Sequence, residues 1–221
     1  MRQNPVNRCP KPAFNRGTEE SAVSSGLSRR AVVAGIFATS ATAGLAGCST
    51  VPEQYANPAY VRTTVRYDTR ETPGTIIVDP SDYYLYSVEK DGQALRYGVG
   101  VGAEEYAWSG VAFVHSKQEW PNWYPPAEML QRQPEIIPFL SELEGGLGMP
   151  GGPNNPLGAR ALYLWQDNKP TLYRIHGTND RWSIGQRASS GCIRMRNTDV
   201  IHLYNRTTVG TKVIVMPSRT A

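Results

Sequence analysis

Apolar and polar residues alternate with a period of two over most of the chain after residue 74, as they do in half-buried strands. Residues 75–79 and 83–89 have this pattern, and the Asp-Gly pair that follows them is typical of a tight hairpin turn. The next segment, residues 94–102, has its large apolar side chains on one face. These are Leu95, Tyr97, Val99 and Val101. The pattern therefore predicts a hairpin of strands at the start of the folded domain.

Four further strands are predicted in the rest of the chain. They are residues 110–115, with Val111, Phe113 and His115 on one side, and residues 160–165, 171–176 and 211–216. Residues 166–170 form a turn between the second and third of these strands. Residues 197–207 begin with capping side chains and space Val200, Leu203 and Tyr204 as an apolar stripe, which predicts a helix. The fold class is therefore mainly β, a sandwich or barrel with one helix near its end.

Residues 116–157 interrupt the alternation and are rich in proline and glycine. Within them, residues 125–132 and 138–146 are predicted to be short helices, because proline is tolerated in a first turn and glycine ends a helix. Long insertions in compact domains are usually functional or disordered, and Trp120 and Trp123 need somewhere to pack. We expect an inserted lid segment that forms a wall over the site. The alternative is a loop that only packs on the sandwich.

Residues 1–47 have the features of an export signal. Arg29 and Arg30 precede an apolar stretch that is too short and too rich in small residues for a membrane span, and the pair resembles a twin-arginine signal. The letters LAGC resemble the lipobox of bacterial lipoproteins, which implies cleavage before Cys48 and lipid attachment to its sulfur. The alternative is an ordinary signal in which Cys48 is incidental.

Residues 48–74 contain Pro52 and Pro58 and are expected to be a tether, which leaves residues 75–217 as the folded domain. Ser49 follows Cys48 where an acidic residue would favour the inner membrane, so family rules favour an outer-membrane lipid anchor. We therefore expect a periplasmic protein that is held to a membrane by its lipid.

The net positive charge of the chain belongs to the export signal. Residues 1–47 contain six of the 23 basic residues and two of the 19 acidic ones, so 17 basic and 17 acidic residues remain after cleavage. A balanced mature chain offers no basis for binding nucleic acid.

Of the three cysteines, Cys9 lies in the signal and Cys48 at the lipidation site, so the mature domain has one free thiol, Cys192. A lone thiol in an exported protein is a candidate reactive group or intermolecular partner, and the alternative is a buried structural thiol. Ser190 and Gly191, rather than an apolar run, precede it, which favours reactivity. The three histidines and this cysteine lack the spacing of metal ligands, and no C-x-x-C motif is present, so we expect no metal, no cofactor and no redox role.

A cysteine nucleophile acts as the thiolate and needs a base. His115 ends a strand with no motif around it, and His202 lies off the apolar stripe of its helix and is expected to face solvent. His176 ends a strand and is followed by Gly177, at a junction where catalytic side chains often project. Near the cysteine, Gly191 permits a tight backbone whose amides would stabilise an oxyanion.

The letters HGT at residues 176–178, sixteen residues before the cysteine of SSGCIRM, resemble the L,D-transpeptidase (YkuD) catalytic domain family. VGTKVIV near the C-terminus, NPLGARALYL and the strands from residue 76 are similar to the same family, in matching order. The resemblance implies a YkuD-like β-sandwich with a catalytic Cys–His pair, and makes residues 75–217 the catalytic domain.

Family roles carry over to five residues of this chain. The resemblance implies that Cys192 is the nucleophile and His176 the base, and that the carbonyl of Gly177 orients the imidazole. It also implies that the amides of Gly191 and Cys192 form the oxyanion hole, and that Arg194 holds a carboxylate of the substrate.

The chain departs from the family at Ser190, where many members have a second histidine. A hydroxyl at this substrate-facing position donates one hydrogen bond but carries no positive charge, which bears on how strongly the thiolate and oxyanion are stabilised.

The implied reaction is attack of Cys192 on the diaminopimelate carbonyl of a peptidoglycan tetrapeptide stem, with release of D-alanine. Transfer to an amine on a second stem would make a cross-link, and transfer to a protein would attach it to the cell wall. With water as acceptor, or with an existing link as substrate, the same site would be an L,D-carboxypeptidase or hydrolase. A non-catalytic lipoprotein that binds peptidoglycan is the remaining alternative, and Ser190 is its best support.

Overall fold

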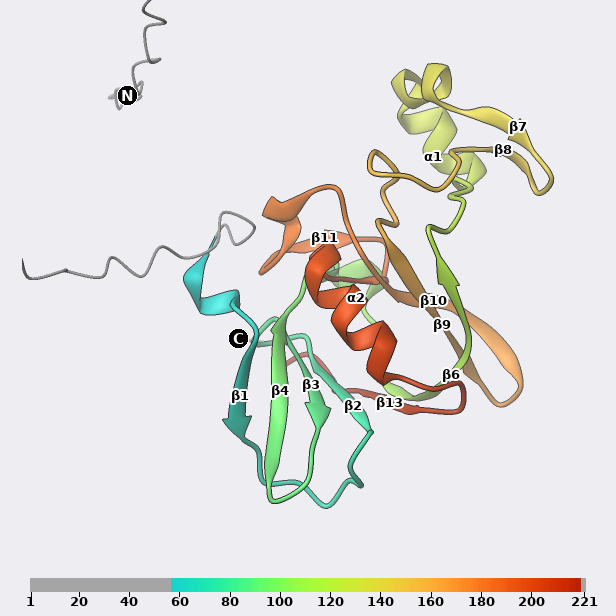
Figure 1. Cartoon of the computed structure of the whole chain (residues 1–221). Coiled ribbons are helices and arrows are strands. Elements are labelled where there is room, and N and C mark those ends of the chain that lie inside the picture. The colour runs from blue at the N-terminus through green and yellow to red at the C-terminus, as the bar shows by residue number, and fades with distance from the viewer. Residues whose placement is uncertain (1–56, 220–221) are drawn as a thin grey trace, which may run out of the picture. The chain divides into compact units, whose positions relative to one another are not determined.

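The seven predicted strands and two that were not predicted form one sheet of nine strands in the computed structural model, which describes residues 57–219 (Figure 1). Their order across the sheet is β1, β4, β3, β2, β13, β6, β9, β10 and β12. The bounds are β1 Thr63–Arg66, β2 Ile76–Asp79, β3 Tyr84–Val88, β4 Gln93–Gly98, β6 Gly110–Glu119, β9 Arg160–Gln166, β10 Lys169–His176, β12 Ile193–Arg194 and β13 Lys212–Val215. The fold is mainly β, as the alternation predicts.

Smaller elements complete the domain. Two short strand pairs lie outside the large sheet, β5 (Val101–Gly102) with β11 (Arg187–Ser189) and β7 (Ser141–Leu143) with β8 (Gly146–Gly148). The α-helices are α1 (Ala127–Arg132) and α2 (Asn197–Arg206), and the 3-10 helices are η1 (Pro58–Tyr60), η2 (Glu104–Tyr106), η3 (Pro134–Phe139) and η4 (Arg181–Ser183).

Both predicted hairpins form, and their turns have the backbone that their residues favour. Asp91 and Gly92 between β3 and β4 have φ of 58° and 67°. Asp167 and Asn168 between β9 and β10 have φ of 49° and 59°. Two successive positive φ values match the right-handed twist of the flanking strands, which is why Asp-Gly and similar pairs are preferred there.

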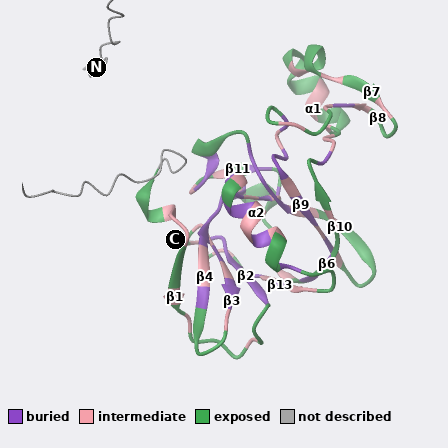
Figure 2. Cartoon of the chain, in the orientation of Figure 1, coloured by how far each residue is buried: buried purple, intermediate pink, exposed green. Residues whose placement is uncertain are grey.

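The core lies between the inward face of the sheet and helix α2 (Figure 2). Tyr97, Val99 and Val101 are buried in it, and Leu95 packs against it, as predicted. The stripe of α2 is confirmed too, since Val200 and Leu203 are fully buried. On β6, Ala112 and Val114 point into the core. Val111, Phe113 and His115 lie together on the outer face and are exposed.

The sheet curls until its last strand meets the chain that follows β4. Gly100 donates a backbone hydrogen bond to Arg194 at 2.9 Å, and Arg194 donates one back at 2.8 Å. Ile175 and Ile193, on the parallel pair β10–β12, both lie in the core. The short strand β12 is therefore held on both sides, and the residues next to it are fixed relative to β10.

Two predictions about secondary structure are wrong. Residues 63–66, which the sequence analysis placed in the tether, pair with β4 as the edge strand β1, and three of these four residues are exposed, as suits the edge of a sheet. The helix predicted for residues 138–146 is instead the end of η3 and the hairpin β7–β8. Gly146 at its turn has φ of 103°, and a side chain on Gly148 would meet the ring of Tyr124, so tertiary packing selects the hairpin.

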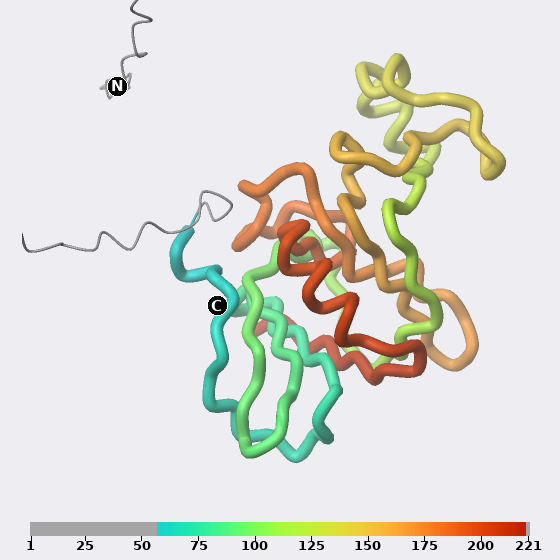
Figure 3. The backbone as a smooth tube through the Cα atoms, in the orientation of Figure 1, coloured from blue at the N-terminus to red at the C-terminus, as the bar shows by residue number. Residues whose placement is uncertain are grey.

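The inserted segment differs at its start from the predicted one, since residues 116–119 continue strand β6. Figure 3 shows the remainder, in yellow, running beyond the ends of β6 and β9 before the chain returns to the sheet. The export signal of residues 1–47, the lipidation site Cys48 and the tether up to residue 56 lie outside the described residues. Among residues 57–219, no helix is long and apolar enough to cross a membrane.

Candidate active site

Four side chains that could take part in catalysis lie on one face of the parallel pair β10–β12. The register pairs Ile175 with Ile193 and His176 with Arg194. Because successive side chains of a strand point to opposite faces, the buried isoleucines define the core face. Arg174 and His176 on one strand, and Cys192 and Arg194 beside them, therefore lie on the other face. Cys192 immediately precedes β12, so extending the register by one residue puts Arg174 opposite Cys192 and His176 diagonal to it.

The backbone around Cys192 is tightly packed. Gly191 has φ of 100°, and a Cβ on it would lie 2.1 Å from Cε1 of Tyr173. On the other side, a Cβ on Gly102 would lie 2.8 Å from the Cα of Gly191. The hydroxyl of Ser189 donates a hydrogen bond to the carbonyl of Cys192. Position 191 thus requires glycine, both for its positive φ and because no side chain would fit there. This backbone fixes the direction of the side chain of Cys192, which is half-buried and forms no disulfide.

His176 is buried, with 4% of its surface exposed. Its Nδ1 donates to the carbonyl of Gly177 at 2.5 Å, so the neutral ring keeps Nε2 as its proton acceptor. Burial is the largest cause that lowers its pKa from 6.5 to about 4, and the nearby Arg194 and Arg174 act in the same direction. The carbonyls of Gly177 and Leu157 oppose these effects. His176 is therefore an uncharged base at neutral pH.

The first residue of α2 holds the backbone next to the histidine. The Oδ1 of Asn197 accepts a hydrogen bond from the amide of Ala159 at 2.9 Å. A Cβ on Gly177 would lie 2.2 Å from this oxygen, and one on Gly158 would lie 2.3 Å from it. The HGT motif needs glycine at position 177 because α2 approaches the backbone too closely for a side chain. This packing holds the carbonyl of Gly177 where it accepts the hydrogen bond from the imidazole.

A cleft of about 420 Å3 lies beside Arg174. Its walls come from the sheet and from the inserted segment, and its lining residues are Gln118, Asn122, Trp123, Tyr124, Glu144, Leu157, Tyr163 and Arg174. The base of the inserted segment is held by the buried Asn155, whose amide donates to the carbonyls of Pro121, Met149 and Pro150 at 3.0 to 3.1 Å. The insertion therefore forms one wall of a cleft next to the cysteine.

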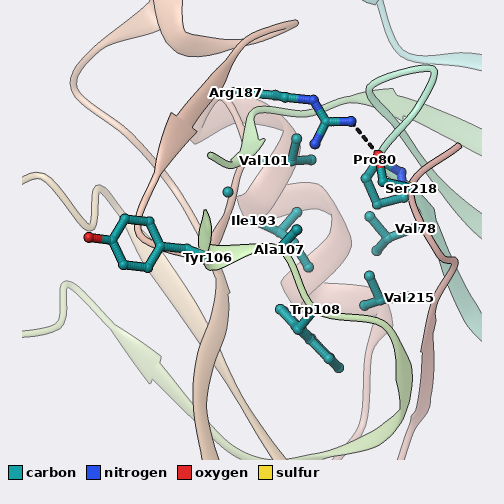
Figure 4. A pocket seen from close by; sticks show the side chains of 12 residues that line it. Val78, Pro80, Val101, Tyr106, Ala107, Trp108, Arg187, Ile193, Val215 and Ser218 are labelled. Carbon is teal, nitrogen blue, oxygen red and sulfur yellow. Dashed lines mark hydrogen bonds between the residues drawn. The ribbon is translucent and has the colours of Figure 1, made fainter. Parts of the chain in front are cut away.

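Figure 4 shows a second, small cavity of about 20 Å3. Gly191 and Ile193, which flank Cys192, line it, together with Val101, Trp108 and Val215 among others. Trp108 also stacks on Tyr173, with ring centroids 4.8 Å apart. This cavity is apolar and too small for a substrate, so it belongs to the packing that supports the cysteine rather than to the site of chemistry.

The structure brings together Cys192, His176, Gly177, Gly191 and Arg194, all of which the sequence analysis singled out. Ser190 is exposed, and it is the preceding residue, Ser189, that bonds to the carbonyl of Cys192.

The two other histidines lie elsewhere in the fold. His115 stacks on Trp165 at 3.7 Å between ring centroids. His202 was expected to face solvent but is half-buried, and its Nδ1 is 2.9 Å from the hydroxyl of Tyr97. A buried tyrosine hydroxyl needs a partner, which is the physical reason for this difference.

Sequence reasoning missed Arg174. Its Nη1 lies 4.0 Å from the Sγ of Cys192. Arg174 and His176 are two positions apart on one predicted strand, so the period of two already places both on one face. What the sequence lacks is the pairing of β10 with β12, which brings the cysteine to that face.

The family model and the curated relatives that match this chain name one family. Residues 73–215 match the model of the L,D-transpeptidase catalytic domain, YkuD. The chain is 32% identical over 173 residues to the "Probable L,D-transpeptidase ErfK/SrfK" of Escherichia coli K12, covering 76% of this chain and 48% of that protein. It is 31% identical over 203 residues to the "Putative L,D-transpeptidase in ATP synthase subunits region ORF 5" of Fuscovulum blasticum, covering 86% and 98%.

A solved structure is also similar to this chain. It is the Brucella melitensis protein described as a "Probable carnitine operon oxidoreductase caia", which is 44% identical to this chain. The match covers 75% of this chain and 99% of that one, with a TM-score of 0.47. A likeness of backbones at this score adds nothing to the assignment. The match of the catalytic-domain model, which spans the sheet from β2 to β13, carries it instead. The chain therefore belongs to the L,D-transpeptidase catalytic domain family.

Proposed function

We propose that this protein is a peptidoglycan L,D-transpeptidase that acts through Cys192. The observation that carries the proposal is the pairing of β10, which ends at the buried, uncharged His176, with β12, which directly follows the only cysteine of the described residues. An uncharged imidazole with Nε2 available is what a thiol needs in order to lose its proton. The substrate class, the stem peptides of peptidoglycan, follows from the family.

In the first step, the Cys192 thiol transfers its proton to Nε2 of His176, and the sulfur attacks the diaminopimelate carbonyl of a tetrapeptide stem. The tetrahedral oxyanion accepts hydrogen bonds from the amides of Gly191 and Cys192. The intermediate collapses when the C–N bond to D-alanine breaks, and His176 returns its proton to the departing amine. The product is a thioester between Cys192 and the stem, plus free D-alanine.

In the second step, an acceptor amine attacks the thioester while His176 accepts its proton, and the Cys192 sulfur leaves. An amine on a second stem gives a cross-link, and an amine on a protein attaches that protein to the wall. The cleft beside Arg174 contains Trp123, Tyr124 and the carboxylate of Glu144. An acidic group in an aromatic-walled cleft suits an ammonium group, which supports an amine rather than water as the acceptor.

For the location of this reaction, we infer a periplasmic enzyme. The twin-arginine export signal of residues 1–47 and lipidation of Cys48 remain proposals that rest on the sequence alone. A lipid at Cys48 would anchor the domain to a membrane, with the outer membrane favoured, and would keep it next to peptidoglycan.

The experiment is incubation of the purified chain, and of its Cys192→Ala variant, with a disaccharide tetrapeptide, followed by mass spectrometry. We expect free alanine and a cross-linked dimer that lacks one alanine, with the wild-type chain only. Loss of alanine without a dimer would identify an L,D-carboxypeptidase.

A further measurement separates an inactive site from an unsuitable substrate. A carbapenem should acylate the wild-type chain, and intact mass should show one adduct that the Cys192→Ala variant lacks. If both forms bind the tetrapeptide, neither turns it over, and no adduct forms, the proposal is wrong and a non-catalytic peptidoglycan-binding lipoprotein is favoured.

A further inference from the structure

Arg174 is placed directly against the sulfur of Cys192. The two residues lie opposite each other in the extended register of β10 and β12, and Nη1 of Arg174 is 4.0 Å from Sγ. On the other side of Arg174, the register of β9 places Tyr163, and the guanidinium lies 5.4 Å from the centroid of that ring. Arg174 therefore lies between an aromatic ring and the thiol.

The charge of Arg174 is not neutralised by a carboxylate within residues 57–219. No ion pair forms between its guanidinium and an acidic side chain there, and its buried Nε has no hydrogen-bond partner. Arg160, on the neighbouring strand β9, contrasts with it, since Glu119 pairs with Arg160 at 3.0 Å. A half-buried guanidinium without an acidic partner favours an anion nearby, and the sulfur of Cys192 is the atom in reach.

The other groups that face Cys192 do not supply this charge. Tyr163 on β9 is neutral, His176 is uncharged because it is buried, and Arg194 lies opposite His176 rather than opposite the cysteine. From the inserted segment, Tyr124 and Glu144 line the cleft that Arg174 borders. From η2 and β10, Tyr106 and Tyr173 contact Gly191. Arg174 is therefore the cation in contact with the sulfur, and the exposed Ser190 carries no charge.

We propose that Arg174 is a catalytic residue that stabilises the thiolate of Cys192. The proton of the thiol moves to Nε2 of His176, Arg174 keeps its own protons throughout, and its positive charge lies beside the sulfur anion until the sulfur attacks. In this chain the arginine provides from the sheet the electrostatic stabilisation that the uncharged Ser190 cannot provide. The inference deepens the proposed function, but its main test needs no peptidoglycan.

The test is the rate of alkylation of Cys192 by iodoacetamide as a function of pH, because only the thiolate reacts. Wild type is compared with Arg174→Gln, which removes the charge, and Arg174→Lys, which keeps it. The control is Arg66→Gln, because Arg66 lies on the exposed edge strand β1 and pairs with Asp68. Thermal unfolding of each variant shows whether it is folded.

We expect Arg174→Gln to lower the alkylation rate near neutral pH about tenfold. Arg174→Lys should stay within about twofold of wild type, and Arg66→Gln should not change the profile. If Arg174→Gln does not fold, Arg174→Met provides the test, because it removes the charge and keeps an unbranched side chain. Its alkylation rate near neutral pH should fall to the same extent.

A folded Arg174→Gln with the wild-type alkylation rate overturns the proposal, as does a folded Arg174→Met with the wild-type rate where Arg174→Gln is unfolded. Slower carbapenem acylation with an unchanged alkylation profile also overturns it, because Arg174 would then position the acylating molecule and not the thiolate. Failure of the proposed function gives a different result, namely no turnover of tetrapeptide by a protein whose alkylation still depends on Arg174.

Discussion

Replacing the imidazole of His176 by a side chain that does not titrate should change how stability depends on pH. Burial lowers the pKa of this ring to about 4, whereas a histidine in the unfolded chain titrates near 6.5. Between these two pH values the unfolded chain binds a proton that the folded protein does not. The free energy of unfolding therefore falls as the pH falls through this range.

The magnitude follows from the two pKa values. At about 1.36 kcal/mol per pH unit, the difference between 6.5 and about 4 corresponds to about 3 kcal/mol. This contribution is present in full above about pH 6.5 and has been lost when the pH reaches about 4. For a domain of this size, about 3 kcal/mol is a large fraction of the total stability.

The matched variant is His176→Asn, because an asparagine amide can donate to the carbonyl of Gly177 in place of Nδ1. Urea unfolding of both proteins at about pH 7.5 and about pH 4 gives the loss of unfolding free energy in each. Wild type should lose about 3 kcal/mol more than the variant. Equal losses in the two proteins, or a His176 ring that titrates near 6.5 by NMR, would refute the reasoning.

Three further outcomes are expected. Gly191→Ala should lower the free energy of unfolding, measured in urea, by about 2 kcal/mol or more and should slow acylation, because the new Cβ meets the ring of Tyr173. The control is Gly152→Ala, which has open space around its Cβ and should change the free energy of unfolding by less than about 0.5 kcal/mol. Asn155→Ala should speed hydrogen exchange of residues 121–150, because three carbonyls at the base of the inserted segment lose their donor; unchanged exchange would contradict this role. Ser189→Ala should slow carbapenem acylation about tenfold in a stopped-flow assay, since the carbonyl of Cys192 loses its hydrogen bond, and an unchanged rate would show that this bond does not hold the loop.

Local signals predicted the elements of this fold well where each element could be formed by its own residues. The two hairpins depend on alternation and on turn residues that tolerate positive φ, and both properties are local. The prediction of a helix for residues 138–146 was wrong because proline and glycine mark a boundary without deciding what lies between two boundaries. There, contact of Gly145 and Gly148 with the ring of Tyr124 favours a hairpin.

For the site, the sequence by itself determined which residues have the chemistry, namely Cys192, His176 and the glycines beside them. Tertiary structure decided which of them meet. Arg174 and Cys192 are 18 residues apart, and their contact depends on the parallel register of β10 and β12. The buried His176 depends likewise on the packing of chain around it, which lowers its pKa. Both properties arise from pairing between distant segments, and no local pattern along the chain encodes the register of such a pair.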